Sequence, residues 1–191
     1  MKHDIGVKSF EYQESGVPRT RDLQSGRIHK SRESCGVWRF RDEAWKVFSS
    51  MDQYGKIKND YEGARNKGVP IPEFEFKRGY VYDKNGRRRE GFALVVTYIT
   101  SGRRFTLPKD CTNLKTAIRS ITKDKVLQKI EHGLRKAIEA GVVDPQGFID
   151  PENVKSPITF IDIHTKSTPS LALDELHKFA LGRINDVQSQ S

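Results

Sequence analysis

The spacing of apolar residues predicts a helix early in the chain. Four apolar residues recur at i, i+3, i+4 and i+7 over about 41–54, namely Ala44, Val47, Phe48 and Met51. This spacing is typical of a helix with one apolar side. A second, short helix is expected over 59–67, where glycine and proline follow. Trp38 and Trp45 lie near the first helix, and we expect them to pack in the core rather than stack on bases.

Three later segments have the composition of β-strands. Residues 74–83 alternate aromatic and polar side chains, and residues 91–100 are rich in β-branched and aromatic ones. The sequence Asp-Lys-Asn-Gly at 83–86 favours a turn between them, because asparagine and glycine tolerate a positive φ. Residues 103–107 follow a second turn. The pattern predicts a three-stranded antiparallel meander.

Helical spacing returns after the meander. Thr112 is expected to cap one helix, and a second should run over 124–140 and end at Gly141. The proline-containing segment 142–157 is predicted to be a connector. Residues 158–164 are apolar on both sides, which favours a strand inside a sheet. A last helix is expected, with a stripe made of Leu173, Leu176, Ala180 and Ile184.

These elements together predict an α+β fold, in which a three-stranded antiparallel meander packs against helices and a C-terminal strand and helix are added. Residues 1–36 contain scattered glycine, serine and arginine, and they favour an irregular basic arm with at most one short strand at its start. Residues 37–141 form the expected α-β-β-β-α core. Residues 142–191 form an acidic extension, which we expect to belong to the same compact domain.

The charged residues are unevenly distributed along the chain. The 191 residues carry a net charge of +9, and the sequence pI is about 9.6. Residues 71–141 contain 16 Lys or Arg against eight Asp or Glu, whereas residues 142–191 contain four against seven. A basic middle is typical of proteins that bind polyanions. The acidic end is expected to face a protein partner or a second subunit.

The sequence predicts neither a cofactor nor a metal site. Cys35 and Cys111 are far apart and lack the spacing of a disulfide framework or a zinc site. No apolar segment follows Met1, and no apolar run is long enough to span a bilayer. We therefore expect a cytoplasmic, nucleoid or nuclear protein that is not secreted and does not contact a membrane.

The basic residues of the middle segment are the candidate binding residues. Arginine is suited to phosphate because its guanidinium group can donate two parallel hydrogen bonds. A two-stranded ribbon also fits the major groove of DNA. The expected hairpin and the helix after it supply thirteen candidates: Lys77, Arg78, Lys84, Arg87, Arg88, Arg89, Arg103, Arg104, Lys115, Arg119, Lys123, Lys125 and Lys129.

The order of elements over about 41–140 resembles the double-stranded-RNA-binding domain. The segment Arg-Asn-Lys-Gly-Val-Pro-Ile-Pro-Glu-Phe-Glu-Phe at 65–76 is similar to the loop and first strand of that family, at Gly68, Pro70, Pro72, Glu73 and Phe74. The resemblance implies an α-β-β-β-α module that contacts phosphates.

The chain departs from that family where the second helix begins. The family has a phosphate-gripping lysine cluster there, whereas residues 106–115 contain only Lys109 and Lys115 as basic residues. A three-stranded sheet followed by a helix is equally similar to the arm-type DNA-binding domains of phage integrases and to plant AP2-type domains. Such likeness of fold does not fix a function.

Two catalytic arrangements are considered. Glu75 and Lys77 match the acid-x-lysine half of a metal-dependent nuclease motif, with Asp52 or Asp60 as the second carboxylate. His164, close to Asp162, has the chemistry of a general base. Neither is complete, so no catalytic residue is assigned.

The sequence therefore favours a non-enzymatic protein that binds DNA or RNA through a basic hairpin and an adjacent basic helix. One alternative is a small viral or mobile-element factor that docks on an acidic host protein. The other is the metal-dependent nuclease.

Overall fold

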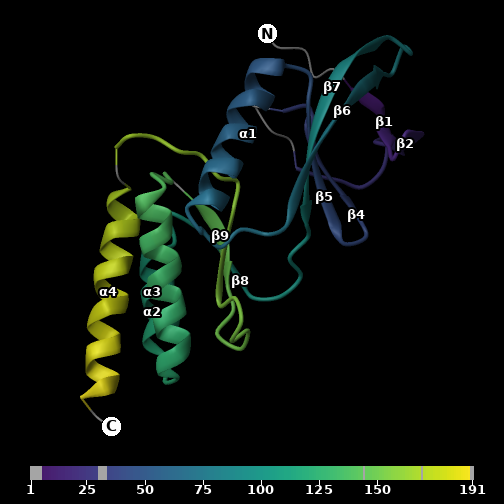
Figure 1. Cartoon of the computed structure of the whole chain (residues 1–191). Coiled ribbons are helices and arrows are strands. Elements are labelled where there is room, and N and C mark those ends of the chain that lie inside the picture. Colours follow the sequence, from purple (N-terminus) through teal and green to yellow (C-terminus); the bar gives the residue numbers. More distant parts are fainter. Residues whose placement is uncertain (1–5, 30–33, 144, 169, 190–191) are drawn as a thin grey trace. The chain divides into compact units, whose positions relative to one another are not determined.

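The structure is a computed structural model, and it describes residues 6–29, 34–143, 145–168 and 170–189 (Figure 1). It combines four described helices with antiparallel sheets, which confirms the predicted α+β class. The chain divides into two compact units. Unit 1 comprises Met1–Lys58 and Glu73–Ile99, and unit 2 comprises Asn59–Pro72 and Thr100–Ser191.

Unit 1 contains a curled antiparallel sheet of seven strands. The strands lie in the order β2-β1-β6-β7-β5-β4-β3, so that strands distant in sequence become neighbours. Their bounds are Val7–Glu14 (β1), Val17–Asp22 (β2), Arg27–His29 (β3), Gly36–Phe40 (β4), Glu43–Phe48 (β5), Phe74–Asp83 (β6) and Arg88–Thr97 (β7).

The inner face of this sheet holds an aromatic core. Trp45 is fully buried, and its ring lies 5.3 Å from that of Tyr12 and 6.2 Å from that of Phe10. Trp38 is also buried, and its indole N–H donates to the carbonyl of Leu23 at 2.8 Å. Both tryptophans therefore pack in the core, as the sequence predicts, and the polar atom of Trp38 has a partner there.

Helix α1 (Met51–Asn66) begins in unit 1 and packs on the outer face of the sheet. The ring of Tyr54 stacks on Phe92 at 4.6 Å and meets Phe76 edge-on at 5.5 Å. Because side chains alternate between the two faces of a strand, both faces of β7 are buried here. The helix continues through the segment where a separate short helix was predicted.

Two predictions for the first third of the chain are wrong. Residues 43–48 form a strand, because Trp45 and Val47 alternate inward and the strand pairs on both sides, with β4 and β7. That pairing overrides the helical spacing. Residues 1–36 are not an irregular arm, since β1, β2 and β3 lie within them and β1 pairs with both β2 and β6. Residues 1–5 and 30–33 of that predicted arm lie outside the described residues.

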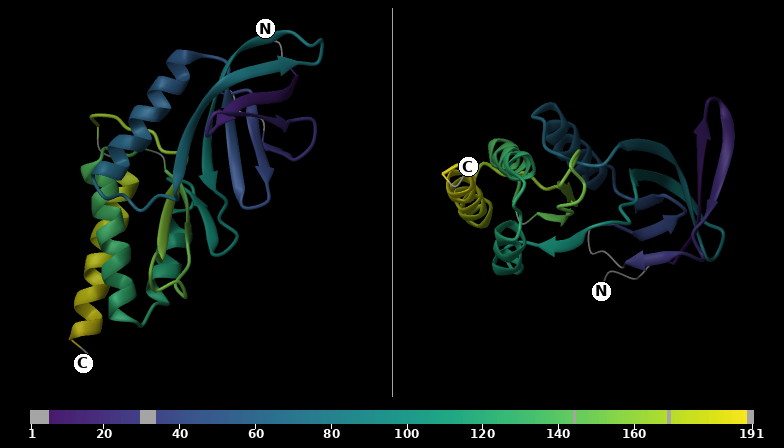
Figure 2. Two further views of the ribbon diagram at one scale, coloured as in Figure 1. Left: turned by 45° about the vertical axis from the view of Figure 1, so that its right-hand side comes forward. Right: turned by 90° about the horizontal axis from the view of Figure 1, so that it is seen from below.

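Unit 2 contains a second antiparallel sheet, in the order β10-β9-β8. Helices α2, α3 and α4 gather on one side of this small sheet (Figure 2). The strands are Arg103–Thr106 (β8), Gln146–Ile149 (β9) and Ile158–Ile161 (β10), and the helices are Cys111–Arg119 (α2), Asp124–Glu139 (α3) and Leu171–Gln188 (α4). The apolar stripe of the last helix is buried as predicted.

The arrangement of these strands corrects three predictions. The third strand of the predicted meander, β8, pairs with β9 and not with β7. The two neighbours of β7 are β6 and β5. The predicted connector 142–157 contains β9, the central strand of the small sheet. β10 is an edge strand and not an internal one, although the N–H of Phe160 donates to the carbonyl of Pro70 at 2.7 Å. Burial against helices explains its apolar character.

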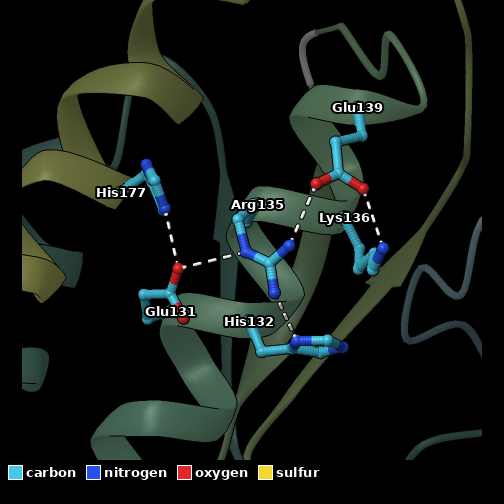
Figure 3. Close-up of polar contacts among 6 residues, drawn as sticks. All are labelled: Glu131, His132, Arg135, Lys136, Glu139 and His177. Atoms are coloured by element: carbon cyan, nitrogen blue, oxygen red, sulfur yellow. Dashed lines mark hydrogen bonds and ion pairs between the residues drawn. The ribbon is translucent and has the colours of Figure 1, made fainter.

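A chain of polar contacts joins α3 to α4 (Figure 3). The carboxylate of Glu131 lies 2.9 Å from Nε2 of His177 on α4 and 3.4 Å from Nε of Arg135. Arg135 also reaches Glu139 at 3.1 Å and Nδ1 of His132 at 2.9 Å. Glu131 and His177 are more than four-fifths buried, so this contact is shielded from water.

The acidic residues of α4 have basic partners within unit 2. Glu175 pairs with Lys115 of α2, which lowers the pKa of Glu175 and raises that of Lys115. Asp174 lies 2.8 Å from Lys178, and Asp186 lies 3.2 Å from Arg183. The acidic side of α4, which was predicted to face a protein partner, is thus largely neutralised by basic residues of the same unit.

We predict that Gly79→Ala destabilises the protein by about 1–3 kcal/mol, because overpacking has this cost. A Cβ at residue 79 would lie 1.9 Å from the carbonyl oxygen of Glu11, so β1 and β6 would have to separate. Urea unfolding measures the effect. Gly55→Ala is the control: its Cβ meets nothing within 4 Å inside α1, and it should stabilise by about 0.5–1 kcal/mol. Equal effects of the two substitutions would contradict the close approach.

We predict that Glu131→Ala lowers the free energy of unfolding by roughly 1–3 kcal/mol, since two partly buried donors lose their acceptor. The control is Asp186→Ala, which breaks an ion pair whose carboxylate side chain is 60% exposed and should change stability by less than about 0.5 kcal/mol. Thermal and urea unfolding of both variants compare them. Indistinguishable stabilities would show that the α3–α4 contact contributes nothing.

Candidate nucleic-acid interface

The turn between β6 and β7 is held by one buried carboxylate. Oδ1 of Asp83 accepts hydrogen bonds from the backbone N–H of Asn85 at 2.8 Å and of Arg87 at 2.9 Å. Gly86 has a φ of 74°, which its lack of a side chain permits. The predicted turn is therefore confirmed, and its two cations, Lys84 and Arg87, have a fixed backbone.

The register of the hairpin distributes the three adjacent arginines over two faces. Tyr82 is opposite Arg88, and Val81 is opposite Arg89. Because successive side chains point to opposite sides of a strand, Arg88 shares a face with Tyr82, whereas Arg89 shares the other face with Val81. Arg87 and Arg89 also line a small pocket beside Cys35, and burial raises the pKa of that thiol.

The six hairpin cations differ in whether a carboxylate neutralises them. Lys77 is only 10% exposed and lies 2.6 Å from Glu75, over the ring of Tyr12. Arg78 donates to Glu90 at 2.8 Å. The other four are exposed, and within the part of the chain that the structure describes none of them forms an ion pair: Lys84, Arg87, Arg88 and Arg89. These four are the cations best placed to meet an external anion.

The remaining seven candidates lie in unit 2, and most have acceptors or aromatic partners there. Arg104 donates to the side chain of Gln146 at 2.7 Å, and Lys129 donates to the carbonyl of Val154 at 2.7 Å. Lys123 lies 3.7 Å from a glutamate carboxylate, Lys115 pairs with α4, and Arg119 lies over an aromatic ring. Arg103 and Lys125 are exposed. Most of this set therefore already contacts other groups of unit 2.

An open groove of about 540 Å³ lies over the hairpin face that carries Arg88. Strands β1, β2, β6 and β7 line it with Glu11, Gln13, Pro18, Arg78, Tyr80, Arg88 and Glu90, among others. Tyr80 is 40% exposed, and the guanidinium carbon of Arg88 lies 3.5 Å from the centre of its ring. An exposed aromatic ring with a guanidinium group over it is a surface on which flat ligands can stack.

The two carboxylates of the groove are both engaged. Glu90 accepts from Arg78, and Glu11 accepts from the hydroxyl of Tyr82 at 3.0 Å. The hydrogen bond to Glu11 raises the pKa of Tyr82, so this phenol keeps its proton. Arg78 and Glu90 neutralise each other, and Glu11 and Arg88 carry opposite charges, so the groove lining has little net charge. Lys84 and Arg87, without ion pairs among the described residues, add positive charge at the turn. Sequence reasoning treated Tyr80 and Tyr82 only as part of the strand pattern. The length of the turn would have placed Tyr82 opposite Arg88 and Tyr80 opposite Glu90.

The residues considered for catalysis are in different settings. Glu75 pairs with Lys77 on the inner face of the unit 1 sheet. Asp60, in unit 2, is buried and accepts a hydrogen bond from Thr165, and its other oxygen lies 3.9 Å from Nδ1 of His164. The second ring nitrogen of His164 lies 3.8 Å from Asp162. These contacts tie α1 to the segment after β10.

Comparison with known proteins gives no family for the chain: no family model, curated protein or solved structure matches it. The resemblance to the double-stranded-RNA-binding domain therefore stays a prediction. Of the helices that the structure describes, none has the length and apolar character needed to cross a membrane.

We predict that Lys77→Ala lowers the free energy of unfolding by about 1–2 kcal/mol, because a nearly buried ammonium group over an aromatic ring is lost. Lys84→Ala removes an exposed cation of the same hairpin and should change stability by less than about 0.5 kcal/mol. Urea unfolding distinguishes the two. If only Lys84→Ala lost stability, Lys84 and not Lys77 would be the cation that stabilises the fold.

Proposed function

We propose that this protein binds nucleic acid without catalysing a reaction on it, and that the end of the β6–β7 hairpin is its main contact with phosphates. The observation that carries the proposal is a set of four exposed hairpin cations that form no ion pair with any described residue, Lys84, Arg87, Arg88 and Arg89. Four positive charges on one short hairpin attract a polyanion because neutralising phosphates releases condensed counterions.

The rest of the charge distribution supports this choice of surface. The chain has a net charge of +9. Most of the other candidate cations are already bound to acceptors, as with Lys115 and Glu175. A cation that must leave such a partner to meet phosphate gains less than one that is free. The hairpin therefore contributes more binding free energy per residue than the helices of unit 2.

The joint replacement of Arg87, Arg88 and Arg89 by alanine should weaken binding and reduce the salt dependence of the affinity. The slope of log K against log salt should fall by roughly 2–3, near one for each lost phosphate contact. Fluorescence anisotropy with labelled single and double strands of DNA and RNA measures this slope.

The matched control replaces three cations of unit 2, Lys123, Lys125 and Lys129, by alanine. It should change the slope less than the hairpin variant does. A larger loss from the control would move the interface to unit 2. Salt-dependent binding to polyglutamate but to no nucleic acid would favour docking on an acidic protein and overturn the proposal.

A further inference from the structure

The pair formed by Tyr80 and Arg88 is more than an accumulation of positive charge. The guanidinium carbon of Arg88 lies 3.5 Å from the centre of the tyrosine ring, which is van der Waals contact. Tyr80 comes from β6 and Arg88 from β7, and both are exposed. The ring supports one side of the guanidinium plane, so a second flat group can stack on the pair without first having to order it.

The surroundings of this pair favour a base over a phosphate. Arg78 neutralises Glu90, and the charge of Arg88 offsets that of Glu11, so the groove lining has little net charge. The groove volume of about 540 Å³ lies within the range of small-molecule sites. Phosphates are attracted instead to the turn, where Lys84 and Arg87 have no carboxylate partner among the described residues.

We propose that this groove takes a single strand of DNA or RNA, with one base stacked on the Arg88 guanidinium above Tyr80 and the backbone directed towards the turn. The inference rests on the proposed function and adds the class of nucleic acid to it. A duplex hides the faces of its bases within the stack, whereas a single strand presents them to aromatic rings and guanidinium planes. Every base has such a face, so binding here tolerates many sequences.

Four single variants separate stacking from charge. Arg88→Lys keeps the positive charge and removes the plane, and Tyr80→Leu removes the supporting ring. Each should weaken binding of a single-stranded 12-mer about tenfold, within the effect of losing one stacked base. The salt slope should not change. Arg39→Lys and Tyr98→Leu are the matched controls, because they change another arginine–tyrosine pair of unit 1 that does not line the groove, and both should bind as the wild type does.

The strand itself supplies an independent test. A single strand in which abasic sites replace the bases keeps its phosphates, so the wild type should bind it about as weakly as Tyr80→Leu binds the intact strand. Urea unfolding of Tyr80→Leu checks that the fold is kept. Wild-type affinity of Arg88→Lys and Tyr80→Leu, or tighter binding of duplex than of single strand, would overturn the stacking inference and leave nucleic-acid binding intact. No salt-dependent binding of any strand would instead remove the proposed function.

Discussion

The close approach of β1 to β6 is the constraint on which unit 1 depends. It is possible only because residue 79 has no side chain where the carbonyl of Glu11 passes. The pairing delivers Phe10 and Tyr12 to the inner face, where they surround Trp45. It also delivers Glu11 to the outer face, where it meets Tyr82. One strand, β1, therefore supplies side chains to both the core and the groove.

The register of the β6–β7 hairpin decides what its arginines can do. A slip of one residue would exchange the faces of every side chain. Arg88 would then point towards the core and Arg89 would lie beside Tyr80. Asp83 opposes such a slip, because its carboxylate accepts hydrogen bonds from two backbone N–H groups of the turn. The residue is only 8% exposed, so water competes little for these bonds. A turn residue thus sets the chemistry of a surface several residues away.

Local signals predicted the structure where contacts are close in sequence. The turn at 83–86, the helix ending at Gly141 and the stripe of α4 follow from rules that act over a few residues. The neighbours of each strand could not be predicted in this way, because local rules do not tell whether β5 or β8 pairs with β7. Long-range packing decides, and β5 takes that place while β8 pairs with β9. The candidate cations were visible in the sequence, but their ion pairs were not: Lys115 meets Glu175 sixty residues later.

Charge and aromatic surface act over different distances on this hairpin. Exposed charges attract a polyanion over about 8 Å at physiological salt, and they do so whatever the polyanion is. Stacking needs contact and a flat ligand, so it distinguishes a nucleic acid from an acidic protein. Lys84 and Arg87, which have no ion pair among the described residues, are at the turn, and the Tyr80–Arg88 pair lies on the strands next to it. Under the proposed function, a strand drawn to the turn would meet the Tyr80–Arg88 pair next, so that affinity from charge would precede selection by shape.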